Sequence, residues 1–420
     1  MTQSTKPSHS PRIHAYAASF GDDLAREAIA ASTEEGDLVL DPFVGAGTTV
    51  LQSLLLNRHA IGIDVDPIAT RISRVITGRF DISYLSDAVS SAADRLTEYE
   101  TRLVANPSLY EDLVPGSAFD IGGQTFSVPN EEAIRFWFDP SHMAILAILK
   151  SLASGEPDPL VKEFFEVVLS STIIRKWPNT LSYAMDIDHS RPHRPQLLNA
   201  QSTDKQFSLV RRILRRALGI VLRVQGELQC TDTEATIYET DADLKLPQLK
   251  PDSVDFVFTS PPYLNAIDYP RAHKFSQWWL APQQPPLGRG RYLGLRRKQV
   301  AEESQISPLS SVAKVLVEDF EDSDRYQDML RYVSDLSSIV QGLHRVVKPD
   351  ASIVFVVADN VLQGKVFPVS GIVSELFSAS GMKGVTSQRR EIKSTRRRYP
   401  FGINGFKSTM RDEYLVTGQK

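Results

Sequence analysis

Two short segments of the chain carry residues whose types and spacing can support chemistry. The first is DPFVGAGTT at residues 41–49, which lies between an apolar run and a helical pattern. Gly45 and Gly47 permit a tight turn and a close backbone approach to a ligand, because glycine has no Cβ. Thr48 and Thr49 stand where the next helix begins, and the N–H groups and hydroxyls of a helix start can bind an anion. This segment predicts a small-molecule site.

An acid next to this turn indicates which kind of small molecule fits. Asp41 would repel phosphates but pair with an ammonium group, so it favours an amino-acid-bearing cofactor over a dinucleotide. Neither the GxGxxG fingerprint nor the lysine of a phosphate-binding loop is present. Asp64 closes the next strand, where an acid accepts hydrogen bonds from ribose hydroxyls, and Asp66 is the alternative for that role.

The second segment is TSPPY at residues 259–263, which directly follows an apolar strand. Pro261 and Pro262 fix φ and remove N–H donors, so the carbonyls of Ser260 and Pro261 can point into a pocket as fixed acceptors. Tyr263 offers a ring face for stacking. A planar heterocycle with an exocyclic NH2 group fits this arrangement, with its two N–H bonds accepted by the Ser260 side chain and the Pro261 carbonyl.

The elements that must position these segments follow an α/β pattern. Strand, glycine turn, helix, strand and acid form the first half of a nucleotide-binding βαβ unit. Each expected strand is an apolar run, as in sheets covered by helices on both faces. Strands are expected at 37–41, 60–64, 235–238, 254–259, 352–358 and 412–417, and helices at 48–57, from Pro67, and at 326–347. The predicted fold is α/β with a Rossmann-like, mostly parallel sheet.

Residues 80–230 instead read as helices with few strand signals. Apolar residues recur at helical spacing over 133–154, 161–174 and the arginine-rich stretch 207–229, with a polar loop at about 177–204. We therefore expect a flexible tail at 1–12, one α/β domain built from 13–80 and 231–420, and a large helical insertion at 81–230.

Composition limits the other possibilities. Lys and Arg number 47 and Asp and Glu 51, for a net charge of −4, so any nucleic-acid surface must be a local patch. The single cysteine, Cys230, excludes a disulfide framework and a thiolate zinc site. No apolar stretch approaches the length of about 18 residues that crosses a membrane, and the first dozen residues lack the apolar core of a signal peptide. The expected location is cytoplasmic.

The pair DPFVGAGTT and TSPPY resembles the S-adenosylmethionine-dependent amino-methyltransferases of DNA, which act on adenine N6 or cytosine N4. HAYAASF at 14–20 resembles the N-terminal cofactor motif of that family, and Thr240-Asp241-Ala242 resembles its third-strand acid. The resemblance covers 11–75 and 235–420. It implies a methyltransferase sheet, S-adenosylmethionine as cofactor, double-stranded DNA as partner and a cognate restriction endonuclease as a candidate partner. The insertion, which it does not cover, is the candidate target-recognition domain.

The resemblance also assigns roles to residues. Phe20 would line the methionine end of the cofactor, and Asp241 would accept from the amino group of its adenine. The predicted cofactor residues are Tyr16, Phe20, Asp41, Phe43, Gly45, Gly47, Thr48, Thr49, Asp64, Asp241 and Thr259. The predicted catalytic residues are Ser260, Pro261, Pro262 and Tyr263, and no metal is expected.

The target base follows from Ser260. In this family SPPY loops mostly belong to cytosine-N4 enzymes, and DPPY or NPPY loops to adenine enzymes. Methylation of cytosine carbon 5 needs a thiolate nucleophile, usually after a proline, whereas Cys230 follows Gln229. Cytosine N4 is therefore favoured, while adenine N6, an RNA methyltransferase and a catalytically silent DNA-binding subunit remain alternatives.

Further polar segments are candidates for contacts with DNA. Two basic clusters fit phosphate contacts or groove reading, with surface solubility as the alternative. Their predicted DNA-binding residues are Arg289, Arg291, Arg296, Arg297 and Lys298, and Arg396, Arg397 and Arg398 within 389–398.

Other residues are candidates for a pocket or a metal site. A pocket for an extruded base can be lined by Asn265, Asp268, Tyr269 and His273. Trp278 and Trp279 fit the core or a pocket wall, with base stacking as the alternative. Asp188, His189 and His193 can form a metal site, although a DNA-contacting or structural loop is the preferred interpretation.

Overall fold

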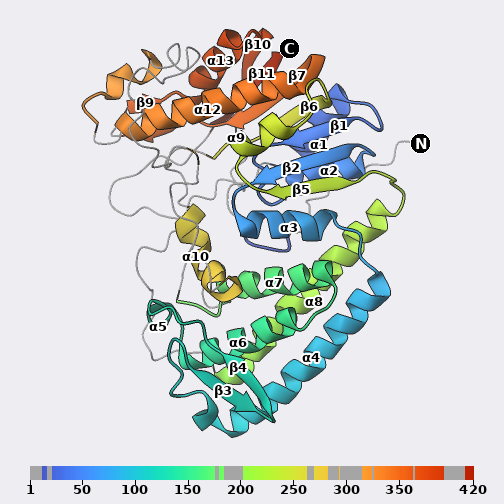
Figure 1. Cartoon of the computed structure of the whole chain (residues 1–420), viewed down its shortest axis with the longest axis vertical. Coiled ribbons are helices and arrows are strands. Elements are labelled where there is room, and N and C mark those ends of the chain that lie inside the picture. Colours follow the sequence, from blue (N-terminus) through green and yellow to red (C-terminus); the bar gives the residue numbers. More distant parts are fainter. Residues whose placement is uncertain are drawn as a thin grey trace.

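The computed structural model describes residues 12–16, 21–175, 179–183, 202–262, 269–281, 293, 315–323, 326–362, 365–391 and 412–420. Within these ranges one end of the molecule holds a sheet with helices on both faces, and the other end holds a group of helices (Figure 1). The strands of the sheet are β1 (Leu38–Asp41), β2 (His59–Asp64), β5 (Ala235–Glu239), β6 (Val254–Thr259), β7 (Val347–Val357), β10 (Lys383–Glu391) and β11 (Asp412–Gln419).

The order of the strands creates a binding edge. It is β10-β11-β7-β6-β1-β2-β5, and β5, β2, β1, β6 and β7 run parallel. β11 runs antiparallel to both β7 and β10. From β1 the chain builds β2 and β5 on one side and then returns to place β6 on the other. Such a topological switch point is where doubly wound sheets bind ligands. The predicted α/β class with a mostly parallel sheet is confirmed.

Helices cover both faces of the central strands. Phe256 and Phe258 of β6 pack in a buried cluster with Leu24 and Ile29, whereas Val257 belongs to the cluster on the opposite face. Because both faces of β6 are covered, the strand reads as a continuous apolar run. The helices of this half are α1 (Asp22–Ser32), α2 (Thr48–Leu55), α3 (Pro67–Thr77), α9 (Ala242–Lys245), α12 (Tyr326–Val346) and α13 (Val369–Ala379).

The other half is mostly helical. Its elements are α4 (Ile82–Ala105), α5 (Ile134–Trp137), α6 (Pro140–Ser154), α7 (Pro159–Ile173), α8 (Thr203–Leu228) and α10 (Tyr269–Leu280), with a hairpin of β3 (Ala118–Ile121) and β4 (Gln124–Ser127). A second small hairpin, β8 (Asn360–Leu362) with β9 (Lys365–Phe367), belongs to the sheet half. The helix expected over 133–154 is divided into α5 and α6. The break comes before Pro140, because proline has no N–H to donate to the carbonyl four residues earlier. No helix in the described ranges has the length and apolar character needed to span a membrane.

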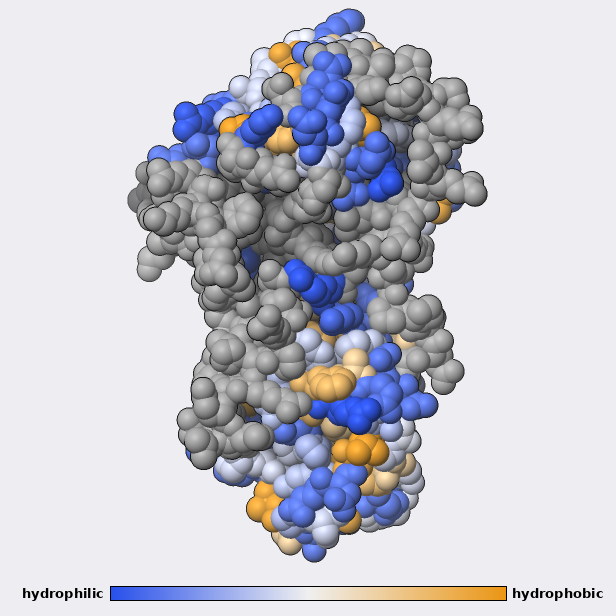
Figure 2. Space-filling model, turned by 90° about the vertical axis from the view of Figure 1, so that its left-hand side faces the viewer, coloured by the Kyte–Doolittle hydropathy of each residue, from blue (hydrophilic) through white to orange (hydrophobic). Residues whose placement is uncertain are grey.

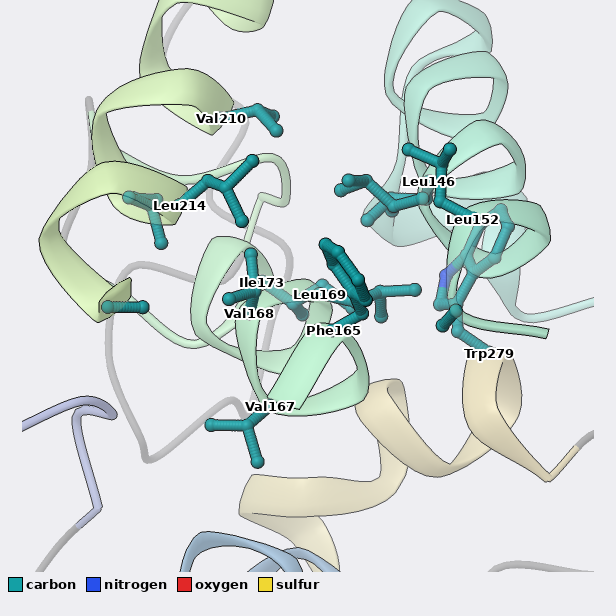
Figure 3. Close-up of a cluster of buried hydrophobic side chains, with 14 of the residues drawn as sticks. Leu146, Leu152, Phe165, Val167, Val168, Leu169, Ile173, Val210, Leu214 and Trp279 are labelled. Atoms are coloured by element: carbon teal, nitrogen blue, oxygen red, sulfur yellow. The ribbon is translucent and has the colours of Figure 1, made fainter. Parts of the chain in front are cut away.

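The core of the helical half is centred on α7. Val168 and Ile173 point toward Val210 and Leu214 of α8, and Phe165 points toward α6 and Trp279 of α10 (Figure 3). The same buried cluster continues into α3, which lies on the sheet (Figure 1). The helical half therefore shares its core with a helix of the nucleotide-binding half.

Ion pairs reinforce this junction between α3 and α7. Arg71 Nε lies 2.6 Å from Glu166 Oε2, and Arg74 Nε lies 2.9 Å from Glu163 Oε1. Glu239, at the end of β5, adds a contact of 3.3 Å to Arg74 Nη2. The pairs are partly buried, so they fix the direction in which α7 crosses α3 more firmly than exposed pairs would.

Leu169 tests how strongly the protein depends on this core. Its side chain is fully buried on α7. We expect Leu169→Ala to lower the free energy of unfolding by about 2–5 kcal/mol, because a cavity remains where the side chain was. Val104→Ala on α4 is the control, since Val104 is 50% exposed. Urea denaturation measures both variants, and equal losses would contradict a core centred on α7.

Candidate active site

The carboxyl ends of β1 and β6 bring the two segments singled out in the sequence into contact. The strands pair in parallel, with Val39 opposite Phe256 and Leu40 opposite Val257. At their ends the Thr259 hydroxyl donates a hydrogen bond to Asp41 Oδ1 at 2.5 Å, although the residues are 218 positions apart. The residue that begins the TSPPY segment thus touches the acid that begins the glycine turn.

The glycine turn has the conformation that its sequence predicts. Gly45 and Gly47 have φ values of +50° and +83°, in the left-handed region that favours glycine. A Cβ on Gly45 would lie 3.2 Å from the Tyr16 ring, and one on Gly47 would lie 3.0 Å from Ser73 Oγ. α2 begins directly after Gly47, so its first N–H groups face this edge.

Thr49 differs from the expectation that its hydroxyl faces a ligand. The side chain is fully buried, and its hydroxyl donates to the Phe258 carbonyl at 3.2 Å. It therefore connects α2 to β6. Thr48 remains partly exposed at the start of α2.

Asp41 is a buried carboxyl group without a cationic partner in the described ranges. Its side chain is 1% exposed, and Oδ1 also accepts from the Phe43 N–H at 3.0 Å. Burial raises the pKa of Asp41 to about 6, and its hydrogen bonds, chiefly the one from Thr259, limit the increase. A ligand ammonium at this position would supply the missing positive charge, in agreement with an amino-acid-bearing cofactor.

Asp64 and Asp66 perform different tasks at the end of β2. Asp64 accepts hydrogen bonds from the N–H groups of Gly45 and Asp66, each at 2.9 Å. The bond from Gly45 fixes the glycine turn to the end of β2. Burial, followed by the charge of Asp66, raises the pKa of Asp64 to about 7. Each carboxylate oxygen has a second lone pair, so Asp64 can still accept from a ligand hydroxyl.

Asp66 has a structural role instead. It caps α3 by accepting from the Ile68 N–H at 2.8 Å, and its other oxygen contacts Nδ1 of His273. Burial alone would raise the pKa of Asp66, but the charge and hydrogen bond of His273 outweigh burial and lower it. Asp64 is therefore the better candidate for a ribose contact.

His273 attaches α10, which follows the TSPPY segment, to this edge of the sheet. It is 2% exposed, and its ring centroid lies 5.2 Å from that of Tyr16, which packs over Gly45. The sequence predicts that His273 lines a pocket for an extruded base. In the structure its side chain is buried and contacts Asp66. Sequence reasoning gave no sign of this contact, because 207 positions separate the two residues.

A second chain of hydrogen bonds runs beside it into the helical half. His14 Nε2 lies 2.9 Å from Ser170 Oγ of α7, which lies 2.7 Å from Ser276 Oγ of α10. Burial, then the charges of His273 and Arg175, lower the pKa of His14 to about 3, so His14 is neutral at physiological pH. His14 and Tyr16, from one short motif, therefore join α7, α10 and the glycine turn.

The remaining predicted residues fall into two groups. Asp241 caps α9 beside Asp64, since the neighbouring Thr240 N–H donates to the Asp64 carbonyl at 2.9 Å. Phe43, Ser260 and Pro262 are partly buried, and Pro261 is buried. Several predicted residues lie outside the described ranges: Phe20, Tyr263, Asn265, Asp268, Asp188, His189, His193, Arg289, Arg291, Arg296, Arg297, Lys298, Arg396, Arg397 and Arg398. Tyr269 begins α10, but its side chain is not described.

The structure also shows the surroundings of several other residues that the sequence singled out. Arg389 and Arg390, at the start of the second basic cluster, lie on β10 and form ion pairs with Asp412 and Glu413 at 2.7 and 3.5 Å. Trp279 is fully buried, which confirms its place in the core. Within the described ranges no group of three His, Cys, Asp or Glu side chains could hold a metal ion.

The chain is similar in sequence to known DNA methyltransferases. A family model described as DNA methylase, of the N6 and N4 type, matches residues 2–74. The Type II methyltransferase M.MvaI of Kocuria varians is 25% identical over 92% of this chain and 84% of its own length. M.MjaII of Methanocaldococcus jannaschii, also a Type II methyltransferase, is 20% identical over 98% of this chain and 82% of its own.

A solved structure also matches in part. It is a candidate DNA modification methylase of Thermus thermophilus, complexed with S-adenosyl-L-methionine. The match has a TM-score of 0.23 and 18% identity, and it covers 43% of this chain and 53% of the other, about half of each.

The buried Asp41 carboxyl leads to a prediction about pH. A raised pKa in the folded state means that stability is lost as the pH rises from the ordinary value of 3.8 through about 6. Asp41→Asn keeps an oxygen for Thr259 and Phe43 and removes the buried charge. We expect this variant to be more stable than the wild type at pH 8 by on the order of 1–3 kcal/mol, with the difference shrinking toward pH 4. Urea denaturation at both pH values measures it, with exposed Asp232→Asn as the control, and a difference independent of pH would contradict the prediction.

The contact between His273 and Asp66 leads to a second prediction. His273→Ala removes the side chain that contacts a buried carboxylate, and we expect a loss of about 3 kcal/mol in the free energy of unfolding. Asp66→Asn in the same chain should recover part of that loss, because no buried charge then remains. A double-mutant cycle measures the coupling, and additive effects within about 0.5 kcal/mol would show that the pair does not interact.

Proposed function

The chain belongs to the family of DNA methyltransferases that act on adenine N6 or cytosine N4, and from this premise we propose that it methylates the N4 amino group of a cytosine in double-stranded DNA. S-adenosylmethionine is the methyl donor. The observation that carries the proposal is the hydrogen bond between Thr259 and Asp41, because it joins the SPPY segment to the buried acid of the cofactor turn.

The residues at the edge of the sheet fit S-adenosylmethionine. Asp41 would hold the ammonium group of its methionine part, and the N–H groups at the start of α2 suit the carboxylate of the same part. Asp64 would accept from the ribose, and Asp241 from the adenine amino group. The bound cofactor supplies an electrophilic methyl group on its sulfonium sulfur.

The residues of the SPPY segment would orient the target. A cytosine inside a duplex hides its amino group, so the base must leave the stack at a cost of a few kcal/mol. Stacking on Tyr263 would return about 1–3 kcal/mol. The Ser260 hydroxyl and the Pro261 carbonyl would accept the two amino hydrogens and so turn the nitrogen lone pair out of conjugation with the ring.

Acceleration in this scheme comes mainly from positioning. The Ser260 hydroxyl is too weak a base to remove a proton from the amine beforehand. The proton therefore leaves to water during or after formation of the N–C bond. This scheme needs neither a metal ion nor a covalent link between enzyme and base.

Ser260 supports cytosine N4 over adenine N6, because SPPY loops in this family mostly act on cytosine. We also propose that the helices of the insertion at 81–230 recognise the target sequence. The similarity to Type II methyltransferases supports a role in protecting cytoplasmic DNA against a cognate restriction endonuclease.

Nucleoside analysis tests the proposal directly. We expect the protein to produce N4-methylcytosine in unmodified genomic DNA incubated with labelled S-adenosylmethionine. Ser260→Ala should lower kcat by about a hundredfold or more, the typical effect of losing an oriented polar contact in an active site. Tyr263→Ala should lower methyl transfer by about 5- to 150-fold, which corresponds to the loss of about 1–3 kcal/mol of stacking. Cofactor affinity should be unchanged in both variants. Ser108→Ala, at an exposed serine, is the control. Formation of N6-methyladenine would overturn the assignment of the base, and cofactor binding without transfer to any DNA would overturn the enzymatic activity.

A further inference from the structure

Three arginines of the helical half lie on one surface that the proposed active site does not use. Arg212 and Arg216 are exposed and one helical turn apart on α8, so they lie on the same face of that helix. Arg175 lies two residues beyond the end of α7. We call these three residues the arginine surface.

Hydrogen bonds place the ends of this surface side by side. Arg212 Nη2 donates to Asn179 Oδ1 at 2.8 Å, which joins α8 to the chain just beyond Arg175. That chain folds back on α7, because the Leu181 N–H donates to the Thr172 carbonyl at 2.8 Å. The apolar face of α8 meanwhile points at α7 (Figure 3).

The positive charge of this surface is not neutralised within the described ranges. No acidic side chain there forms an ion pair with Arg175, Arg212 or Arg216. The neighbouring Arg211 on the same helix, by contrast, pairs with Glu100. Burial, followed by the charges of Arg216 and Arg212, lowers the pKa of Arg175. In a chain with a net charge of −4, such a local excess of positive charge attracts an anionic partner.

The arginine surface lies at the end of α7 that contacts His14 and α10. Ser170, one turn before the end of α7, contacts both His14 and Ser276 of α10. Arg175 is close enough to His14 for its charge to lower the pKa of that side chain. Figure 1 shows α10 between the sheet half and α7, and Figure 2, which views the molecule from the α10 side, shows hydrophilic residues at the waist between the two halves.

We propose that Arg175, Arg212 and Arg216 bind the phosphate backbone of the substrate DNA beside the target base. The inference rests on the proposed function, since it gives a place to the DNA on which that function acts. Guanidinium groups suit this partner because they offer paired N–H donors to phosphate oxygens and keep their charge at any physiological pH. A duplex held here would run along the end of α7 and past α10, with its base-containing grooves toward the SPPY segment.

Salt dependence of DNA binding tests the surface independently of methylation. Each phosphate contact contributes about 0.9 to the slope of log K against log salt concentration. We expect Arg212→Gln/Arg216→Gln to lower that slope by about 2 and the affinity for a short unmethylated duplex at least tenfold. Arg175→Gln should lower the slope by about 1. Arg212→Lys/Arg216→Lys should keep most of the slope, because it keeps the charge.

Arg26→Gln is the matched control, because Arg26 is exposed on α1, which packs against α2 and β6 in the sheet half. Unchanged cofactor affinity in each variant shows that the fold is intact. A wild-type slope in the double glutamine variant would overturn the proposal, and so would a loss of binding to RNA of the same sequence but not to DNA. If the variants lose DNA binding while the wild type methylates no DNA, the proposed function fails and the surface stands. If the wild type methylates DNA and the variants bind it normally, the surface alone fails.

Discussion

The hydrogen bond between Thr259 and Asp41 is the contact on which the rest of the site depends. This bond is made by a buried carboxyl group at the point where β1 and β6 end, and it joins two residues 218 positions apart. Burial raises the pKa of that carboxyl, so the folded chain bears a cost in keeping it ionised at neutral pH. A ligand that brings a positive charge removes this cost. The arrangement is therefore complementary to an ammonium-bearing ligand, and under the proposed function the same bond would set the distance from the cofactor to Ser260.

The contacts around Asp64 and Asp66 extend this constraint from the cofactor turn to the helical half. The Gly45 N–H binds Asp64, the Asp66 N–H binds the same carboxylate, and Asp66 contacts His273 of α10. The SPPY segment is therefore connected to the glycine turn on both sides. Thr259 precedes the segment, and His273 lies on α10, which follows it. One connected set of buried polar groups thus links the two segments, and under the proposed function it would position both the cofactor and the base.

The sequence predicted those parts of the molecule whose pattern is local. β1, β2 and β6 are buried on both faces and read as apolar runs, and Gly45 and Gly47 signal a left-handed turn. β10 was missed because Lys383–Glu391 (KGVTSQRRE) is a largely exposed edge strand without such a run. The contact between His273 and Asp66 was missed for another reason, since nothing local in either residue indicates a partner 207 positions away. The two acids of the DVD stretch at 64–66 could be separated only when their hydrogen-bond partners were known.

The junction between the two halves determines what the helical part can do for a DNA substrate. An insertion on a hinge could adapt to many backbones, but it could not hold a duplex in register with a fixed base pocket. Here α7 shares a buried core with α3, and Arg71 and Arg74 pair with Glu166 and Glu163 across the junction. Because Asp66 caps α3, the orientation of α7 and α8 is tied to the same strand end that holds the glycine turn. Any phosphate contact made on these helices therefore keeps a constant offset from Ser260, and a constant offset is what a site-specific transfer to one extruded base requires.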